Sequence, residues 1–366
     1  MSIDRGDMND GLPPDASRLL ARGAADDVRA RRRIVAASAD LHLDETERLD
    51  DRYRTALHHM IAALVALIET DLRQYAARQL VARGMPEPAL AMSEATLMAD
   101  GALRDAGLLD DPDFMRAMLG RTGLALLAER LPLATAANDR PSLLVRLAEH
   151  RDGVVAAAAK ALLAADARRR EAVDGAAPRN DIAAEQQHQL VWWTAAAIHR
   201  DFAETCESMA DFDRALTEAA TRALSVHDEA ERAEAAAMRL VAMLAPQPGE
   251  RADLLYEALA DRRPALFVAV LAQALELDFD QVRDVVIDPD SDRLWVMLRA
   301  AALERDTIAR LGLALCEAMP GRDVEAFADR LDTIMAVTPV AAEAALAPLR
   351  RHTDLRTALA RMGNRR

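Results

Sequence analysis

Aromatic residues are scarce in this chain: three tryptophans, three tyrosines and six phenylalanines make up 3% of its 366 residues. Strands favour aromatic and β-branched residues, whereas the alanine and leucine that dominate here are strong helix formers. No run of the sequence alternates apolar and polar residues as a half-buried strand would. The composition therefore predicts an all-α protein, and its 51% of hydrophobic residues is ample for a buried core.

Cysteine is nearly absent as well. Cys206 and Cys316 are too few for a disulfide framework or a metal site, so a reducing cytoplasm is the simplest setting. The polar, acidic start at 1–7 lacks the apolar core of a secretory signal. The longest apolar stretches, 60–68 and 265–275, fall short of the roughly 20 residues that span a bilayer. We therefore expect a cytoplasmic protein without a membrane segment.

Positive charge is in deficit, and lysine occurs only at Lys160. The 46 basic residues face 60 acidic ones, which gives a net charge of −14. This excess opposes sequence-independent binding of nucleic acid, which depends on neutralising phosphates. Short arginine runs lie near acidic residues, and we interpret them as solvated helix ends: 31–33, 168–170 and 365–366. The charge predicts no nucleic-acid partner and favours a protein partner with a basic face.

Catalytic and ligand motifs are also missing. No glycine-rich phosphate loop, dinucleotide fingerprint or Gly-x-Ser-x-Gly elbow occurs. Residues 288–292 resemble the start of a calcium loop, but Arg293 and Arg299 stand where glycine and glutamate are needed. A turn that caps the helix carrying Trp295 explains this segment better. We expect no catalytic residue, metal or cofactor, and an enzyme is the least favoured class.

Three residues share one face of a predicted helix: His188, Trp192 and His199. The two histidines are eleven residues apart, about 16 Å along a helix, so they cannot share a metal ion. We favour packing of this stripe on a neighbouring helix. If the stripe is exposed, it becomes the candidate partner contact, because aromatic residues anchor interfaces. Trp193 and Trp295 are expected in the core.

The clearest helix of the N-terminal half is predicted over 45–83, which contains no glycine before Gly84 and no proline. Apolar residues recur at helical spacing, and a shifted stripe predicts a break near 69–71. His58 and His59 are adjacent and lack the glutamate of a zinc-protease motif. We therefore place them at the boundary between the buried and the solvent-exposed face of this helix. This helix could also pair with a second copy, which would make a homo-oligomer.

Glycine and proline divide the chain into consecutive regions. The predicted regions are a disordered lead (1–16), N-terminal HEAT-like helices (17–165), a linker (166–182), central long helices (183–245) and C-terminal repeat-like helices (250–366). Short helices are expected at 17–39, 88–99, 102–108, 112–119, 124–131, 252–260, 265–275, 279–287, 292–302, 307–319, 324–336, 340–350 and 355–361. The stretch 179–245 should break near 211–213 and near 225–228.

A weak internal repeat supports stacked helices. Residues 69–80 align with 152–163 at an offset of 83 residues, about two periods of a HEAT unit of roughly 40 residues. Candidate helix caps are Asp306, Asp323 and Thr338, the last before a proline at the first helical position.

Several segments together resemble an uncharacterised alphaproteobacterial family known as a domain of unknown function with HEAT-like helices. They are 71–80, 192–197, 227–229, 254–259, 265–268 and 288–289. The resemblance covers most of the chain from about residue 45 onward. Its motifs are packing motifs, so it implies the fold and supplies no catalytic residues.

These observations predict a class of function. Stacked helical pairs bury a continuous core and leave an extended surface free for a partner. We therefore expect a non-catalytic cytoplasmic protein-binding scaffold or adaptor. The alternative is a regulatory module that binds a small ligand in a pocket between the central and C-terminal helical regions.

Overall fold

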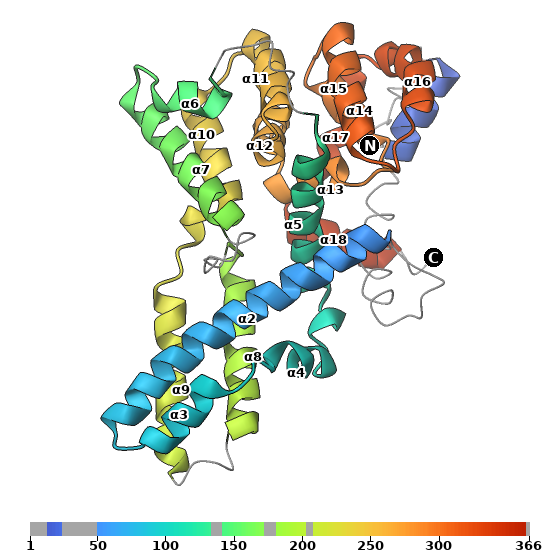
Figure 1. Ribbon diagram of the computed structural model, residues 1–366. Coiled ribbons are helices and arrows are strands. Elements are labelled where there is room, and N and C mark those ends of the chain that lie inside the picture. Colours follow the sequence, from blue (N-terminus) through green and yellow to red (C-terminus); the bar gives the residue numbers. More distant parts are fainter. Residues whose placement is uncertain (1–12, 24–49, 133–140, 172–180, 203–207, 364–366) are drawn as a thin grey trace, which may run out of the picture. The chain divides into compact units, whose positions relative to one another are not determined.

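The structure is a computed structural model that describes residues 13–23, 50–132, 141–171, 181–202 and 208–363. Every regular element in these ranges is a helix and none is a strand, which confirms the predicted all-α class (Figure 1). The chain forms two compact units, which are treated separately below. Unit 1 comprises 1–33, 123–160 and 237–366, and unit 2 comprises 34–122 and 161–236. Each unit is composed of segments that are far apart in the sequence. The division of the chain into consecutive regions, made from glycine and proline, stays a prediction.

Unit 2 is built around one long helix. α2 packs against α3, α4, α8 and α9, and α8 packs against α9 (Figure 1). The elements are α2 (Asp51–Ala82), α3 (Pro86–Glu94), α4 (Ala99–Asp105), η1 (Leu108–Asp110), α8 (Ala184–Phe202), α9 (Met209–Ser225) and η3 (Glu229–Glu231). Three further helices have residues in both units: α5 (Pro112–Arg130), α7 (Gly153–Glu171) and α10 (Ala233–Leu244).

α2 is continuous through 69–71, so the predicted break is wrong. The shifted apolar stripe has another cause, because several helices contact α2 and bury more than one of its faces. The Asp50 carboxylate accepts a hydrogen bond from Arg52 N at 3.2 Å and begins the helix. The predicted start, at 45–49, lies outside the described residues.

α2 is longer than the apolar stretches considered for a membrane span in the sequence. It is long and apolar enough to cross a bilayer by length and composition, and α16 with α17 passes the same test as a pair bent by 96°. Core helices of proteins outside membranes share this composition. In α2 the apolar side chains Leu57, Ile61, Leu64, Leu72 and Leu80 are buried in the core of unit 2.

Several N-terminal helices are longer than the sequence suggested. α5 runs through Gly120, where two separate helices were predicted. A glycine inside a helix costs only about 1 kcal/mol relative to alanine, and packing offsets that cost because Gly120 is buried. α7 continues to Glu171, into the predicted linker, while 172–180 lie outside the described residues. Residues 14–23 are helical although 1–16 were predicted to be disordered.

The central stretch breaks at one of the two predicted places. The break near 225–228 is confirmed, because α9 ends at Ser225 and α10 begins at Ala233. The break near 211–213 is wrong, because these residues lie in the first turns of α9. Asp211 stabilises that end, since an acidic side chain in the first turn favours the helix dipole.

The train of short helices in unit 1 is confirmed, with ends that differ by a few residues. Its elements are α11 (Pro248–Ala260), α12 (Pro264–Leu275), α13 (Phe279–Val286), α14 (Arg293–Ala300), α15 (Arg305–Ala318), α16 (Val324–Ala336), α17 (Pro339–Leu346), η4 (Ala347–Arg350) and α18 (Thr353–Gly363). Unit 1 also contains α6 (Leu143–Ala148), which was not predicted. Asp323 and Thr338 cap α16 and α17 as predicted. Asp306 does not cap, because it lies inside α15, whose N-cap is Glu304.

Trp295 lies in the core of unit 1, as predicted. Its ring stacks on Phe327 with centroids 4.6 Å apart. The preceding turn differs from the prediction, because the Asp292 side chain does not cap α14. Asp292 is buried and forms ion pairs with Arg22 at 2.6 Å and with Arg330 at 2.5 Å. This carboxylate therefore joins three segments of unit 1.

Arg299, at the position where a calcium loop would need glutamate, has a structural partner instead. Its Nε donates to the carbonyl of Val337 at 2.9 Å and its Nη1 to that of Leu303 at 3.0 Å. Burial lowers the pKa of this guanidinium, while Glu304 acts in the opposite direction. Arg299 thus supplies donors to two carbonyl groups in the core of unit 1.

Candidate functional site

His188 and Trp192 lie on the exposed side of α8, so the predicted packing of this stripe is wrong for both. Trp192 is 36% exposed, and its ring meets the His188 ring edge-on with centroids 6.4 Å apart. α8 turns a different face toward α2 and α9, and that face holds Leu190, Val191, Thr194, Ala195 and Ile198. His188 and Trp192 are therefore exposed, which is the condition under which we expect this stripe to contact a partner.

His199, the third member of the stripe, packs against the neighbouring helix as predicted. Its Nε2 lies 2.9 Å from Asp213 Oδ1 on α9, and its ring lies 5.7 Å from the ring of Phe212. The ionised carboxylate can only accept, so His199 Nε2 carries the proton in this hydrogen bond. Trp193 is partly buried against the core of unit 2, in line with its predicted place.

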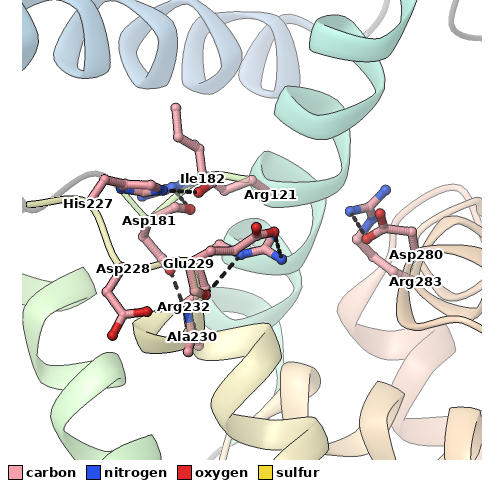
Figure 2. A network of polar contacts seen from close by, with 11 residues as sticks. Arg121, Asp181, Ile182, His227, Asp228, Glu229, Ala230, Arg232, Asp280 and Arg283 are labelled. Carbon is pink, nitrogen blue, oxygen red and sulfur yellow. Dashed lines mark hydrogen bonds and ion pairs between the residues drawn. The ribbon is translucent and has the colours of Figure 1, made fainter. Parts of the chain in front are cut away.

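Three distant groups hold the segment that leads into α8 (Figure 2). The carbonyl of Asp181 accepts from Arg121 Nη1, and the carbonyl of Ile182 accepts from His227 Nε2 at 3.1 Å. The Asp181 carboxylate accepts from Ala233 N at 3.1 Å, at the start of α10. Sequence reasoning missed this network, because its members are separated by dozens of residues and form no motif. The network fixes where the exposed face of α8 begins.

The turn beside His227 is stabilised locally. The Asp228 carboxylate accepts from the backbone N–H of Ala230 at 2.8 Å, and Arg232 pairs with Glu229 at 2.7 Å. A separate ion pair drawn in Figure 2, between Asp280 and Arg283 at 2.6 Å, belongs to α13 in unit 1. These contacts order short segments within their own units.

Asp111 joins α8 to the start of α5. Its carboxylate accepts from Phe114 N at 3.0 Å, from Gln189 Nε2 at 2.9 Å and from Asp113 N at 2.9 Å. Burial by itself would raise the pKa of Asp111, but the three hydrogen bonds to the charged form lower it below its ordinary value. Asp111 therefore acts as a charged helix cap and a tether for α8.

In the part of the chain that the structure describes, no three His, Cys, Asp or Glu side chains gather so as to hold a metal ion. Cys316 is buried, and burial raises the pKa of its thiol. Cys206 lies outside the described residues. His58 is half-buried and His59 exposed on α2, which fits their predicted place at a boundary. They line a cavity on α2 and α4; a ligand pocket between the central and C-terminal regions stays a prediction.

A family model described as an uncharacterised protein conserved in bacteria (DUF2336) matches residues 125–347. The match includes 192–197, 227–229 and 254–259, which contributed to the resemblance found in the sequence, but it begins well after residue 45. No curated protein and no solved structure matches the chain. Because the family model covers more than half of the sequence, the chain belongs to the DUF2336 family of bacterial proteins.

Proposed function

We propose that this chain is a non-catalytic cytoplasmic scaffold or adaptor, and that it binds a protein partner through the exposed face of α8. The observation that carries the proposal is the exposure of Trp192 beside His188 on the side of α8 that faces away from α2 and α9. Tryptophan is enriched among the residues that dominate interface energetics. Because a helix already orders its backbone, little further conformational freedom is lost on binding.

The packing of consecutive helices supports a HEAT-like architecture for this scaffold. In unit 1, α11 packs on α12, α12 on α13 and α15 on α16, which are neighbours in sequence, while α14 packs on α17 and α11 on α15. Arrays of this kind bury a continuous core through nearest-neighbour contacts and use the remaining surface for binding. We include such stacking in the proposal.

The negative charge of the chain favours a partner with a basic face. The net charge is −14, and the exposed Glu185 lies two turns before Trp192 on the same face of α8. A partner with a basic face would be attracted over a distance of about 10 Å at 0.1 M salt. We therefore expect the association rate to fall as salt rises, as electrostatically steered binding does.

A photocrosslinking amino acid at position 196, an exposed site one turn after Trp192 on α8, tests the proposal in cells of the native host. We expect one specific crosslinked protein, recovered again by co-purification with the unmodified chain. Trp192→Ala should weaken its binding about 30-fold or more, the loss expected for an interface anchor. His188→Ala should have a smaller effect, because His188 contacts only one edge of the tryptophan.

Tyr256→Ala is the matched control. Tyr256 is an exposed aromatic residue of unit 1, at 41% exposure, and it lies under Arg310 at 4.8 Å. Retention of the partner by Tyr256→Ala and its loss in Trp192→Ala would support the α8 face. Equal binding by both variants would refute it. Light scattering of both variants tests the alternative that the partner is a second copy of the chain.

A further inference from the structure

A cationic pocket lies on α2 and α4, apart from the exposed stripe of α8. Its cavity measures about 370 Å³ and is lined by Arg54, Thr55, His58, His59, Ala62 and Arg104. Two arginines, two histidines and a hydroxyl surround the space, and no carboxylate is among the described residues that line it. Such a lining is unusual on a chain with a net charge of −14.

Hydrogen bonds define how His58 presents its ring. Arg104 Nη1 lies 3.0 Å from His58 Nδ1, and a guanidinium can only donate. His58 Nδ1 is therefore the acceptor in this bond, so the proton of the neutral ring is on Nε2. That Nε2 is buried and has no hydrogen-bond partner. His58 thus offers a donor that nothing in its surroundings satisfies.

Arg54 offers a second unsatisfied donor in the same pocket. Its Nη2 pairs with Asp51 at 2.6 Å, whereas its Nη1 is buried without a partner. Asp51 is 84% exposed, so this pair is screened by water. Buried donors are nearly always satisfied in folded proteins, so a bound ion or water that accepts from both groups would account for them.

Arg104 is oriented by its own helix. Asp100, one turn earlier on α4, lies 3.0 Å from Arg104 Nη2 and 3.2 Å from Nε, so it holds one edge of the guanidinium. The other edge, Nη1, meets His58, and both residues are among those that line the cavity. Planar guanidinium groups held in this way suit the oxygens of a phosphate group.

We propose that this pocket binds a small oxyanion, specifically the phosphate group of a phosphate monoester or of free phosphate, with Arg54, His58 and Arg104 as its donors. The cavity is at the lower end of the roughly 300–1,000 Å³ found for small-molecule sites. The proposal is independent of partner binding by α8, because it depends on residues of α2 and α4 alone.

Protonation of His58 should make the affinity of the pocket for an anion depend on pH. Burial lowers the pKa of His58 first, and Arg104, Arg54 and His59 lower it further, while Asp100 acts in the opposite direction. Protonation places a hydrogen on Nδ1 and ends its bond from Arg104, and a bound anion offsets that loss by favouring the charged ring, which raises the pKa of His58. Anion affinity should therefore increase as pH falls through the range between the two values.

Isothermal titration with inorganic phosphate and with glycerol 3-phosphate tests the proposal at constant ionic strength. We expect one site per chain, with Arg54→Gln weakening it about tenfold or more, the loss of a charge-assisted hydrogen bond. Arg78→Gln is the matched control, because Arg78 is an exposed arginine of the same helix about 36 Å farther along the axis. Tighter binding of the ester than of phosphate assigns a monoester; the reverse assigns free phosphate.

Sulfate provides a readout in the unaltered chain, because its charge does not change near neutral pH. In spectra of ¹⁵N-histidine-labelled protein, with His58 assigned through His58→Gln, sulfate should shift the His58 ring nitrogens and leave those of His199 in place. The affinity for sulfate should increase toward lower pH in the unaltered chain. This dependence should weaken in His58→Gln, where His59 is the histidine that still lines the cavity. Equal phosphate binding by Arg54→Gln and Arg78→Gln, or no response of the His58 ring, would overturn the proposal.

Discussion

Glu69 and Arg73 lie one turn apart on α2 and form an ion pair that is almost entirely buried, with side chains 1% and 5% exposed. Glu69 accepts from Met98 N at 3.1 Å and from Ala99 N at 2.9 Å, at the start of α4. Arg73 Nη1 donates to the carbonyls of Ala95 at 2.9 Å and Thr96 at 3.2 Å. The pair therefore holds the loop that delivers α4, and with it Arg104, to α2.

Removal of one member of this pair should destabilise unit 2 severely. We expect Glu69→Ala to lower the free energy of unfolding by about 3–5 kcal/mol, because Arg73 would be left charged and buried. Replacing both residues with methionine should not restore stability, since the backbone groups at 95–99 would lose their partners. Urea unfolding followed by circular dichroism measures both effects, and a stable double variant would contradict them.

Asp111 should contribute stability that depends on pH. Its pKa is lowered in the folded chain, so the contribution is present above the unfolded value of about 3.9 and is lost as pH falls toward the folded value. We expect Asp111→Asn to cost about 1 kcal/mol at pH 7, the difference between hydrogen bonds to a charged and to a neutral acceptor, and much less near pH 3. Urea titrations from pH 3 to 7 test this; the exposed Asp105→Asn should show no such trend.

Gly312 marks a place where α15 approaches a ring too closely for a side chain. A Cβ at this position would lie 2.6 Å from Phe327 Cε1 and Cε2 and closer still to Cζ, and Phe327 stacks on Trp295. We expect Gly312→Ala to cost about 1–3 kcal/mol through overpacking. Thermal unfolding measures the loss, with a change in near-ultraviolet circular dichroism from the displaced tryptophan.

Gly249→Ala is the control for this substitution. Gly249 lies in the first turn of α11, in the same unit, and a Cβ there would meet nothing within 4 Å. It should raise stability by a few tenths to about 1 kcal/mol, because alanine restricts the unfolded chain. Equal stability losses in the two variants would mean that crowding at Phe327 is not the cause.

Cys316 should be chemically silent in the folded chain. It is buried, and burial raises the pKa of its thiol, while reaction with disulfide reagents requires an accessible thiolate. In a Cys206→Ser background, we expect no reaction at pH 8 over minutes and complete reaction in 6 M guanidinium, roughly the condition that unfolds most domains. Rapid labelling of native protein would show that α15 opens locally.

Part of the candidate site could be anticipated from sequence and part could not. The spacing of His188, Trp192 and His199 placed them on one face of a helix, and α8 does present them so. Which of them would find a partner on a neighbouring helix depended on the placement of α9, which supplies Asp213 and Phe212 to His199, while Trp192 contacts the ring of His188. Nothing in the sequence linked His58 to Arg104, because they are 46 residues apart and meet only through the packing of α4 on α2.

The sequence by itself determined the helical class and the short helices of unit 1. Alanine and leucine propensity, the caps at Asp323 and Thr338, and the proline after Thr338 act within a few residues, so they operate before any tertiary contact forms. Tertiary structure decided the continuity of α2 and of α5, the buried pairing of Glu69 with Arg73, and the cationic pocket. All four features depend on which helix covers each face of its neighbour. The local periodicity of a sequence does not specify that neighbour.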